Sequence, residues 1–374
     1  MSPRPGRARM DAGAIRGQET GSARVPSKFS HEVFGIADSG ACNHHSPMSV
    51  PDWLGKKRPG RRVEGLAACL LPFEPDGKMA ETAFREAVAR TSGAGLGCAV
   101  NMDTGYANYI AAEERTAVLR WTTGTLGSGK FFAAGAFVDG KEGELVELYR
   151  REMDEIASFG GTPVIFQTTR FHDWEPQRIV DLYATICEPY QAVIGFELGR
   201  VFAPFGMIYD EEIIRGLMSI PSLMGIKHSS LSRAEELKRL ALRDELRPEF
   251  RIYTGNDLGI DMIEYGSDYL LGLAAFCPEK FAERDRYWEE QDERYYELAD
   301  ALQYLGNVGF RAAVPAYKHS CAVFQHLLGR IPSSEPHPSC PRRPDWEAEI
   351  MGDCALRLGY QPQAQAGSVE GETS

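Results

Sequence analysis

The stretch Ser222-Leu-Met-Gly-Ile-Lys227-His-Ser-Ser230 decides how the rest of the chain is interpreted. It is a short apolar run that ends in a lysine and is followed by small polar residues. This pattern is typical of a buried strand that runs into a turn. Burial at such a position would lower the pKa of the Lys227 amine and make it a nucleophile toward carbonyls, whereas an ordinary strand-end lysine would reach solvent.

Similar short runs alternate with amphipathic segments along most of the chain. The expected strands are Glu64–Leu71, Leu96–Val100, Phe131–Val138, Thr162–Gln167, Ala192–Glu197, Leu223–Lys227, Arg251–Thr254 and Asp268–Leu271. The expected helices between them are Met79–Ser92, Ala111–Thr123, Gly143–Phe159, Glu175–Pro189, Asp210–Ser219, Ser232–Leu246 and Asp257–Tyr265. This alternation predicts an α/β protein with a (β/α)8 TIM barrel. A doubly wound sheet is the alternative, but Phe73-Glu-Pro-Asp-Gly77 after the first strand is no glycine-rich dinucleotide loop.

Composition divides the chain into four parts. Residues 1–62 are rich in Arg, Gly, Ser and Pro and are predicted to be a disordered extension. Residues 63–277 are predicted to form the barrel, and residues 278–360 a helical region with helices at Lys280–Leu305, Phe310–Leu328 and Asp345–Leu358. Residues 361–374 are expected to be a disordered tail.

Charge and cysteine content restrict the class of protein. The formal net charge of −12 argues against nucleic acid or an anionic membrane as the main partner. No apolar stretch reaches the roughly 18 residues that a membrane-spanning helix needs. Eight scattered cysteines without a C-x-x-C pair predict reduced core thiols and a cytoplasmic location. Cys42 lies near His44 and His45, but no second ligand group has zinc-site spacing, so we expect no metal. A phosphate-binding glycine loop is missing too, so we expect no cofactor.

Three stretches resemble the dihydrodipicolinate synthase / N-acetylneuraminate lyase family of Schiff-base aldolases. They are Leu70-Leu-Pro-Phe73 with Asp76-Gly77, then Gly225-Ile-Lys227-His-Ser-Ser230, and finally Tyr253-Thr-Gly-Asn-Asp257 with Asp268-Tyr-Leu-Leu-Gly272. The similarity covers about Val63 to Leu328. It implies a barrel with a C-terminal helical extension, a homotetramer or homodimer, and an imine between Lys227 and a 2-oxo acid. The protonated imine would act as an electron sink for proton loss or bond cleavage at the neighbouring carbon.

Two family motifs are altered in this chain. The Gly-Thr-Thr-Gly-Glu motif after strand two, which holds the substrate carboxylate, is replaced by Asn101-Met-Asp-Thr-Gly-Tyr106. The tyrosine that ends strand five and carries protons in the family aligns with Phe196. The sequence thus keeps the electrophile trap and loses the usual parts for proton transfer.

Several residues are candidates for the missing roles. Besides Lys227, the predicted catalytic residues are Glu197, His172 and Tyr106, with Tyr209 as another source of a phenol. Glu197 could serve only if the strand end twists or bulges, because it should point to the opposite face from Phe196. The predicted substrate-binding residues are Asp103, Thr104, Arg170 and Arg200. Each of them also has an ordinary structural explanation, such as a turn residue or a surface arginine.

The sequence therefore predicts a lyase or synthase that acts on a small-molecule 2-oxo acid, outside lysine biosynthesis. A sugar-acid dehydratase that uses the same imine is the first alternative. A binding protein that keeps the barrel but has lost turnover is the second, and the absent tyrosine motivates it.

Overall fold

The computed structural model describes residues 55–363, and they contain a closed barrel of parallel strands in the order β1 to β8. The strands are β1 (Gly65–Ala68), β2 (Gly97–Val100), β3 (Phe132–Ala136), β4 (Thr162–Ile165), β5 (Val193–Leu198), β6 (Leu223–Ser229), β7 (Arg251–Thr254) and β8 (Asp268–Leu271). Each strand pairs with its neighbours in sequence, and β1 pairs with β8 to close the barrel. The predicted (β/α)8 architecture is confirmed.

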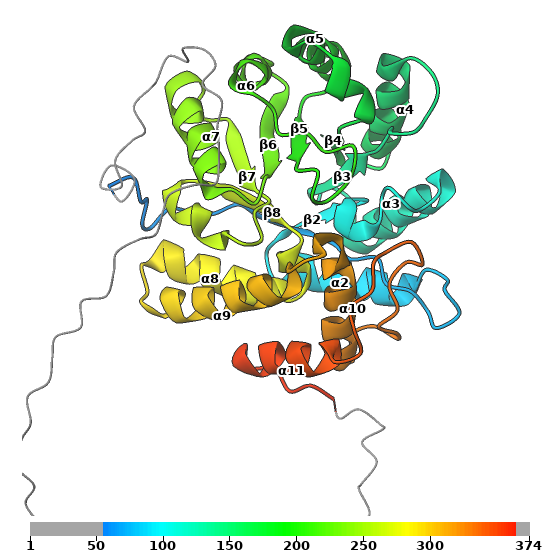
Figure 1. Ribbon diagram of the computed structural model, residues 1–374, viewed down its shortest axis with the longest axis vertical. Coiled ribbons are helices and arrows are strands. Elements are labelled where there is room, and N and C mark those ends of the chain that lie inside the picture. The colour runs from blue at the N-terminus through cyan, green and yellow to red at the C-terminus, as the bar shows by residue number, and fades with distance from the viewer. Residues whose placement is uncertain (1–54, 364–374) are drawn as a thin grey trace, which may run out of the picture. The chain divides into compact units, whose positions relative to one another are not determined.

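Helices surround this barrel (Figure 1). They are α2 (Glu81–Gly93), α3 (Ala112–Leu126), α4 (Leu145–Ser158), α5 (Pro176–Cys187), α6 (Glu211–Met218), α7 (Arg233–Leu246) and α8 (Pro278–Glu290). Between β7 and β8 there is only the 3₁₀ turn η3 (Ile260–Tyr265), where a helix from Asp257 was expected. The carboxylate of Asp257 accepts a hydrogen bond from the backbone of Leu273, and the Asn256 side chain bonds Glu236, so both residues are held against the barrel.

The C-terminal region adds α9 (Arg294–Gly309), α10 (Tyr317–Leu327) and α11 (Glu347–Arg357). The single helix expected over Lys280–Leu305 is wrong, because Gln291 adopts a left-handed conformation with φ of 56° and ends α8. The chain then turns, and α9 lies beside α8 (Figure 1). Helix α8 also packs against the barrel, where it contacts β1 and α2.

The predicted boundary at residue 62 also differs from the structure. Arg58 donates a backbone hydrogen bond to Glu264, and Arg61 pairs with Asp268 at 2.7 Å. Residues 58–61 therefore pack on the barrel. Most of the predicted extension, with Cys42, His44 and His45, lies outside the described residues. The seven cysteines within residues 55–363 are free and buried, as expected for core thiols.

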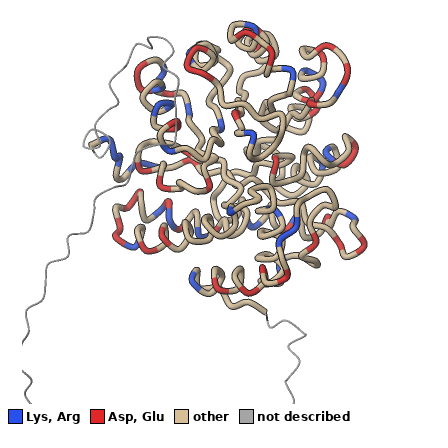
Figure 2. The backbone as a smooth tube through the Cα atoms, in the orientation of Figure 1, with Lys and Arg blue, Asp and Glu red and all other residues tan. Residues whose placement is uncertain are grey.

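Positions of Lys and Arg are interspersed with those of Asp and Glu along the outer helices (Figure 2). None of the helices in the described part of the chain is long and apolar enough to cross a membrane.

Candidate active site

Lys227 lies inside the barrel near the C-terminal end of β6, and only 6% of its surface is exposed. Its Nζ lies 4.5 Å from the centre of the Phe196 ring, which the paired position of β5 supplies. Gly255, just past β7, makes room for the amine, because a Cβ there would lie 2.8 Å from Lys227 Cε. Burial lowers the pKa of Lys227 to about 8, although Asp257 and Asp103 raise it in part. A substantial share of this amine is therefore neutral near physiological pH.

Two buried carboxylates, those of Asp257 and Asp103, interact with the charge of the Lys227 amine. Asp257 follows β7, and its Oδ1 accepts a hydrogen bond of 2.7 Å from the backbone of Leu273. Burial raises the pKa of Asp257 to about 7, so it is close to half protonated at neutral pH. Asp103 lies in the 3₁₀ turn η1 (Asp103–Gly105) after β2 and is 4% exposed. Parallel strands bring both carboxylates to the same end of the barrel as Lys227.

The first two residues of α10 complete this cluster. Lys318 Nζ lies 3.0 Å from Asp103 Oδ1, and the Tyr317 hydroxyl donates to Asp103 Oδ2 at 3.0 Å. Tyr317 also shares a hydrogen bond of 2.8 Å with the Thr104 hydroxyl. Lys318 is 1% exposed and Tyr317 is 3% exposed, so the cluster is screened from water. Asp103 thus has its charge matched by Lys318.

Aromatic side chains line the same end of the barrel. The Tyr106 ring lies 5.6 Å from Phe73, and Lys318 Nζ lies 5.8 Å from the centre of Tyr106 and 5.7 Å from that of Tyr109. His337, from the segment between α10 and α11, stacks on Tyr109 at 5.4 Å. The C-terminal region therefore contributes both charged groups and a cover to the barrel mouth.

The structure brings four of the predicted site residues into this region: Lys227, Asp103, Thr104 and Tyr106. Thr104 contacts Tyr317, and Tyr106 is linked to the cluster through Lys318. Their predicted catalytic or binding roles are geometrically possible and remain predictions.

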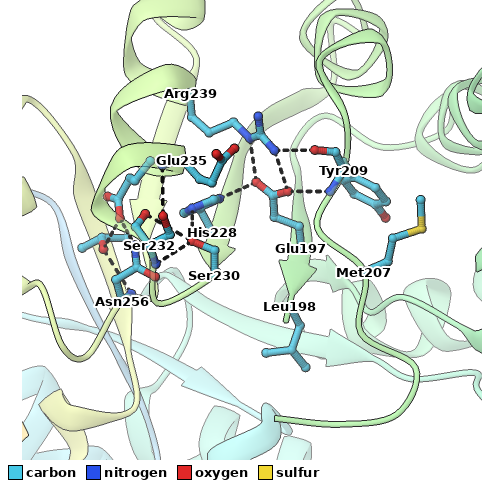
Figure 3. Close-up of polar contacts among 12 residues, drawn as sticks. Glu197, Leu198, Met207, Tyr209, His228, Ser230, Ser232, Glu235, Arg239 and Asn256 are labelled. Carbon is cyan, nitrogen blue, oxygen red and sulfur yellow. Dashed lines mark hydrogen bonds and ion pairs between the residues drawn. The ribbon is translucent and has the colours of Figure 1, made fainter. Parts of the chain in front are cut away.

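The Glu197 side chain lies on the face of the barrel wall opposite to Lys227. It points toward Arg239 on α7 (Figure 3). Phe196 pairs with Lys227 and Glu197 with His228, so the strands alternate regularly here, and no twist turns Glu197 inward. The carboxylate binds His228 Nδ1 at 2.5 Å, Arg239 Nε at 2.9 Å and the backbone of Tyr209 at 3.0 Å. Although burial opposes ionisation, His228 and Arg239 lower the pKa of Glu197 to about 2. The structure does not support a general base at Glu197, because the carboxylate is saturated and faces α7.

The remaining predicted residues are also held elsewhere. His172 bonds the backbone oxygen of Gly206 at 3.2 Å, and Arg170 donates to the backbone oxygens of Lys141 and Gly143. Arg200 is exposed just past β5. Tyr209 bonds Tyr183 at 3.1 Å beside the Glu197 cluster. None of these contacts joins the cluster around Lys227.

Sequence reasoning missed Asp257, Tyr317 and Lys318 as members of the site. Asp257 stood within the quoted stretch Tyr253–Asp257, so the position of its motif after strand seven was an available signal. Tyr317 and Lys318 carried none, because they lie beyond the barrel at the start of a helix. Their bonds to Asp103 span 214 and 215 residues of sequence.

A second feature lies at the opposite end of the barrel. An open cavity of about 1100 Å³ is lined there by residues such as Arg61, Glu64 and Arg251, at the starts of the strands. Arg61 is paired with Asp268 and Arg251 with Glu64. We place the chemistry at the Lys227 end, because the buried groups with shifted pKa values converge there. Among residues 55–363, no group of His, Cys, Asp and Glu side chains is arranged to hold a metal ion.

Comparison with solved structures agrees with the barrel fold. The chain matches a monomeric dihydrodipicolinate synthase variant with a TM-score of 0.69 and 16% identity, over 81% of this chain and 98% of the other. It matches the dihydrodipicolinate synthase of Thermotoga maritima with a TM-score of 0.69 and 15% identity, over 80% and 99% of the two chains. The chain has the dihydrodipicolinate synthase fold.

A third match extends this fold relationship. YagE of E. coli K12, a prophage protein of the dihydrodipicolinic acid synthase family whose structure is a complex with pyruvate, has a TM-score of 0.69 and 14% identity. That match covers 80% of this chain and 99% of YagE. No protein-family model and no curated protein sequence matches the chain. The resemblance to the dihydrodipicolinate synthase family is therefore confirmed at the level of the fold.

Proposed function

We propose that the chain is a lyase or synthase that binds 2-oxo acids as a Schiff base on Lys227. The observation that carries this proposal is the buried amine at the end of β6, whose pKa of about 8 lies well below the ordinary 10.5. At pH 7.5 about a quarter of such an amine is neutral, against roughly one part in a thousand for an ordinary lysine. The neutral form is the nucleophile that attacks a carbonyl carbon.

The charges around Lys227 suit a 2-oxo acid. Lys318 supplies a buried cation beside Asp103, and Asp257 is near its titration point. A bound 2-oxo acid adds one negative charge, and conversion of the neutral Lys227 amine to a protonated imine adds one positive charge. The complex therefore gains no net charge in a region where an unpaired ion would be costly. We infer that Lys318 takes over part of the carboxylate binding that the altered strand-two motif no longer provides.

The fold comparisons support the same class of reaction. The YagE structure contains pyruvate, and so does that of the Acinetobacter baumannii synthase, which matches this chain at 17% identity with a TM-score of 0.67. The changed site, with Phe196 on β5 and an Asp103–Lys318 pair after β2, is the reason why we propose a role outside lysine biosynthesis. Aldol cleavage, condensation and sugar-acid dehydration all use the same imine, so the proposal covers the class.

The test is reductive trapping. The protein is incubated with pyruvate, 2-oxobutyrate or a 2-oxo sugar acid, reduced with borohydride, and analysed by intact and peptide mass spectrometry. We expect one adduct per chain, on the peptide that contains Lys227. Lys227→Arg keeps the positive charge and should give no adduct.

Lys318 is the internal control, because it is equally buried but ion-paired to Asp103 at 3.0 Å. An adduct on Lys318 in place of Lys227 would contradict the assignment. Absence of any adduct across the panel would favour the non-catalytic alternative.

A further inference from the structure

The structure contains a phenol that the sequence alignment did not place in the site. Tyr317 starts α10, and its hydroxyl is bonded to Asp103 Oδ2 at 3.0 Å and to Thr104 Oγ1 at 2.8 Å. Both partners belong to the turn after β2. We propose that Tyr317 is the acid–base residue of the imine chemistry and replaces the tyrosine that Phe196 has displaced from β5. This inference rests on the proposed Schiff base at Lys227.

Shared neighbours place Tyr317 at the same end of the barrel as the Lys227 amine. The charges of Asp103 and Asp257 act on both Lys227 and Tyr317. Gly272, just past β8, admits the ring, because a Cβ there would lie 2.9 Å from Tyr317 Cε2 and 3.2 Å from Thr104 Oγ1. Gly255, just past the adjacent strand β7, likewise leaves room for the Lys227 side chain. Two neighbouring strands thus end in glycines whose missing side chains leave room for these two functional groups.

The Tyr317 ring is held firmly in this position. It stacks on Phe310 with ring centres 4.2 Å apart and planes at 16°. The hydroxyl has two partners of different kinds, a carboxylate that accepts its proton and a hydroxyl that can donate to its oxygen. Lys318 Nζ lies 5.4 Å from the centre of the same ring, where its charge would stabilise a transient phenolate.

These contacts support a balanced sequence of proton transfers. The neutral Lys227 amine adds to the carbonyl carbon of the 2-oxo acid, and one amine proton passes to the carbonyl oxygen. As the C–O bond of this carbinolamine breaks, the Tyr317 phenol gives its proton to the departing hydroxide, which leaves as water. The resulting phenolate takes a proton from C3 of the iminium, and the C–H electron pair becomes the C2–C3 double bond of a neutral enamine.

Other buried phenols fit this role less well. The Tyr106 hydroxyl has no hydrogen-bond partner within the described residues. Tyr183 and Tyr209 bond each other next to the Glu197 cluster. Among the phenols of residues 55–363, Tyr317 combines bonds to two site residues with a nearby cation.

The experiment uses a 2-oxo acid that gives a Lys227 adduct in the trapping test, such as pyruvate. Without borohydride, NMR follows the exchange of its C3 protons with deuterated solvent in the presence of the protein. General acid–base catalysis contributes about 10²–10⁴-fold, so Tyr317→Phe should slow exchange at least about 100-fold. Prolonged borohydride trapping should still label Lys227 in this variant. Tyr183→Phe removes another buried phenol and should exchange at the wild-type rate, while Tyr106→Phe should have a smaller effect than Tyr317→Phe.

The outcomes separate this inference from the proposed function. If the wild-type protein gives no Lys227 adduct, the Schiff-base proposal fails. If it gives the adduct but Tyr317→Phe exchanges at the wild-type rate, or Tyr106→Phe is the slower variant, the assignment of Tyr317 is overturned. The same holds if the unreduced wild-type protein exchanges no C3 protons of a 2-oxo acid that it can be trapped with. If Tyr317→Phe does not fold, Thr104→Val tests the assignment instead, because it removes the hydroxyl that is bonded to Tyr317. The exchange rate should fall about tenfold in this variant. An unchanged rate would likewise overturn the assignment.

Discussion

At the scale of single residues, the ionisation of Lys227 controls the proposed chemistry. Because burial lowers its pKa to about 8, the rate of borohydride-trapped adduct formation should rise with pH and level off above this value. Lys318 lowers this pKa and Asp103 raises it. Lys318→Met should therefore move the midpoint of the pH profile upward, and Asp103→Asn should move it downward, by roughly one pH unit each.

The double variant Asp103→Asn/Lys318→Met is the matched control for this pH prediction. Each single change leaves a buried charge without its partner, which costs about 3–5 kcal/mol of stability, whereas the double change removes both charges. Its midpoint should lie between those of the single variants. Shifts of the two single variants in the same direction would show that the pair does not act on Lys227 through its charges.

Lys227 could be singled out because the local pattern predicts a strand that ends in a lysine, and the resemblance to the Schiff-base aldolases implies its role. Asp103 and Thr104 were predicted because their segment corresponds to the family's motif after strand two. Tyr317 and Lys318 could not be predicted, because only the folded C-terminal region brings them to the barrel. Glu197 was misassigned because the prediction allowed for a bulge at the end of the strand. The pairing of β5 with β6 is irregular between Val193 and Ile194, but it is regular around Glu197, so this side chain points away from Lys227.

At the scale of secondary-structure elements, Glu197 connects β5 to β6 and α7. It accepts hydrogen bonds from Arg239 on α7 and contacts His228 on β6, with no exposed surface (Figure 3). Its pKa is lowered from 4.5 to about 2 in the folded state. The ionised form therefore contributes about 3 kcal/mol of stability above pH 4.5, which is lost as pH falls toward 2.

Glu197→Gln should lower the free energy of unfolding at pH 7 by about 3 kcal/mol, as measured by urea denaturation. Trapping of the remaining folded protein at Lys227 should be retained, because the carboxylate lies on the opposite face of the sheet. Glu245→Gln is the control, since it removes a surface carboxylate that pairs with exposed Arg215 and should change stability by less than about 0.5 kcal/mol. If folded Glu197→Gln no longer gave the Lys227 adduct, Glu197 would have a role in the chemistry after all.

The elements themselves were largely predictable. Strand and helix periodicity located all eight strands and most of the helices, because a parallel barrel buries each strand as a short apolar run. The failures were at breaks that depend on single backbone conformations or long-range bonds. Gln291 ends α8 without a glycine or proline to mark it, and the bonds of Asn256 and Asp257 precede a 3₁₀ turn where a helix was expected.

At the scale of the whole molecule, the C-terminal region belongs to the site and is not only an appendage of the barrel. It supplies Tyr317 and Lys318 from α10, and the segment between α10 and α11 covers the mouth with His337. The predicted homotetramer or homodimer remains a prediction.

Arg343 anchors this cover to the start of α10. Its guanidinium donates to the backbone oxygens of Gly309, Arg311 and Ala312 at 2.7–3.0 Å, and its backbone N–H donates to His319 on α10 at 2.7 Å. Arg343→Met removes these three bonds and a fourth, from Nε to the Ser320 hydroxyl on α10 at 3.1 Å, and should destabilise the local structure by about 2–4 kcal/mol. Hydrogen exchange should accordingly become faster in α10 but stay unchanged in the barrel strands, as measured by mass spectrometry.

The neighbouring Arg342 is a close control for this prediction. Its side chain is 57% exposed and pairs with Glu335 on the surface, so Arg342→Met should leave α10 protection unchanged. Because Arg343 lies outside the cluster, its replacement can act on the chemistry only by loosening Tyr317 and Lys318. We therefore expect slower C3 proton exchange in Arg343→Met together with a normal final yield of the Lys227 adduct. Equal α10 protection in the two variants would show that the segment covers the barrel mouth without holding α10 in place.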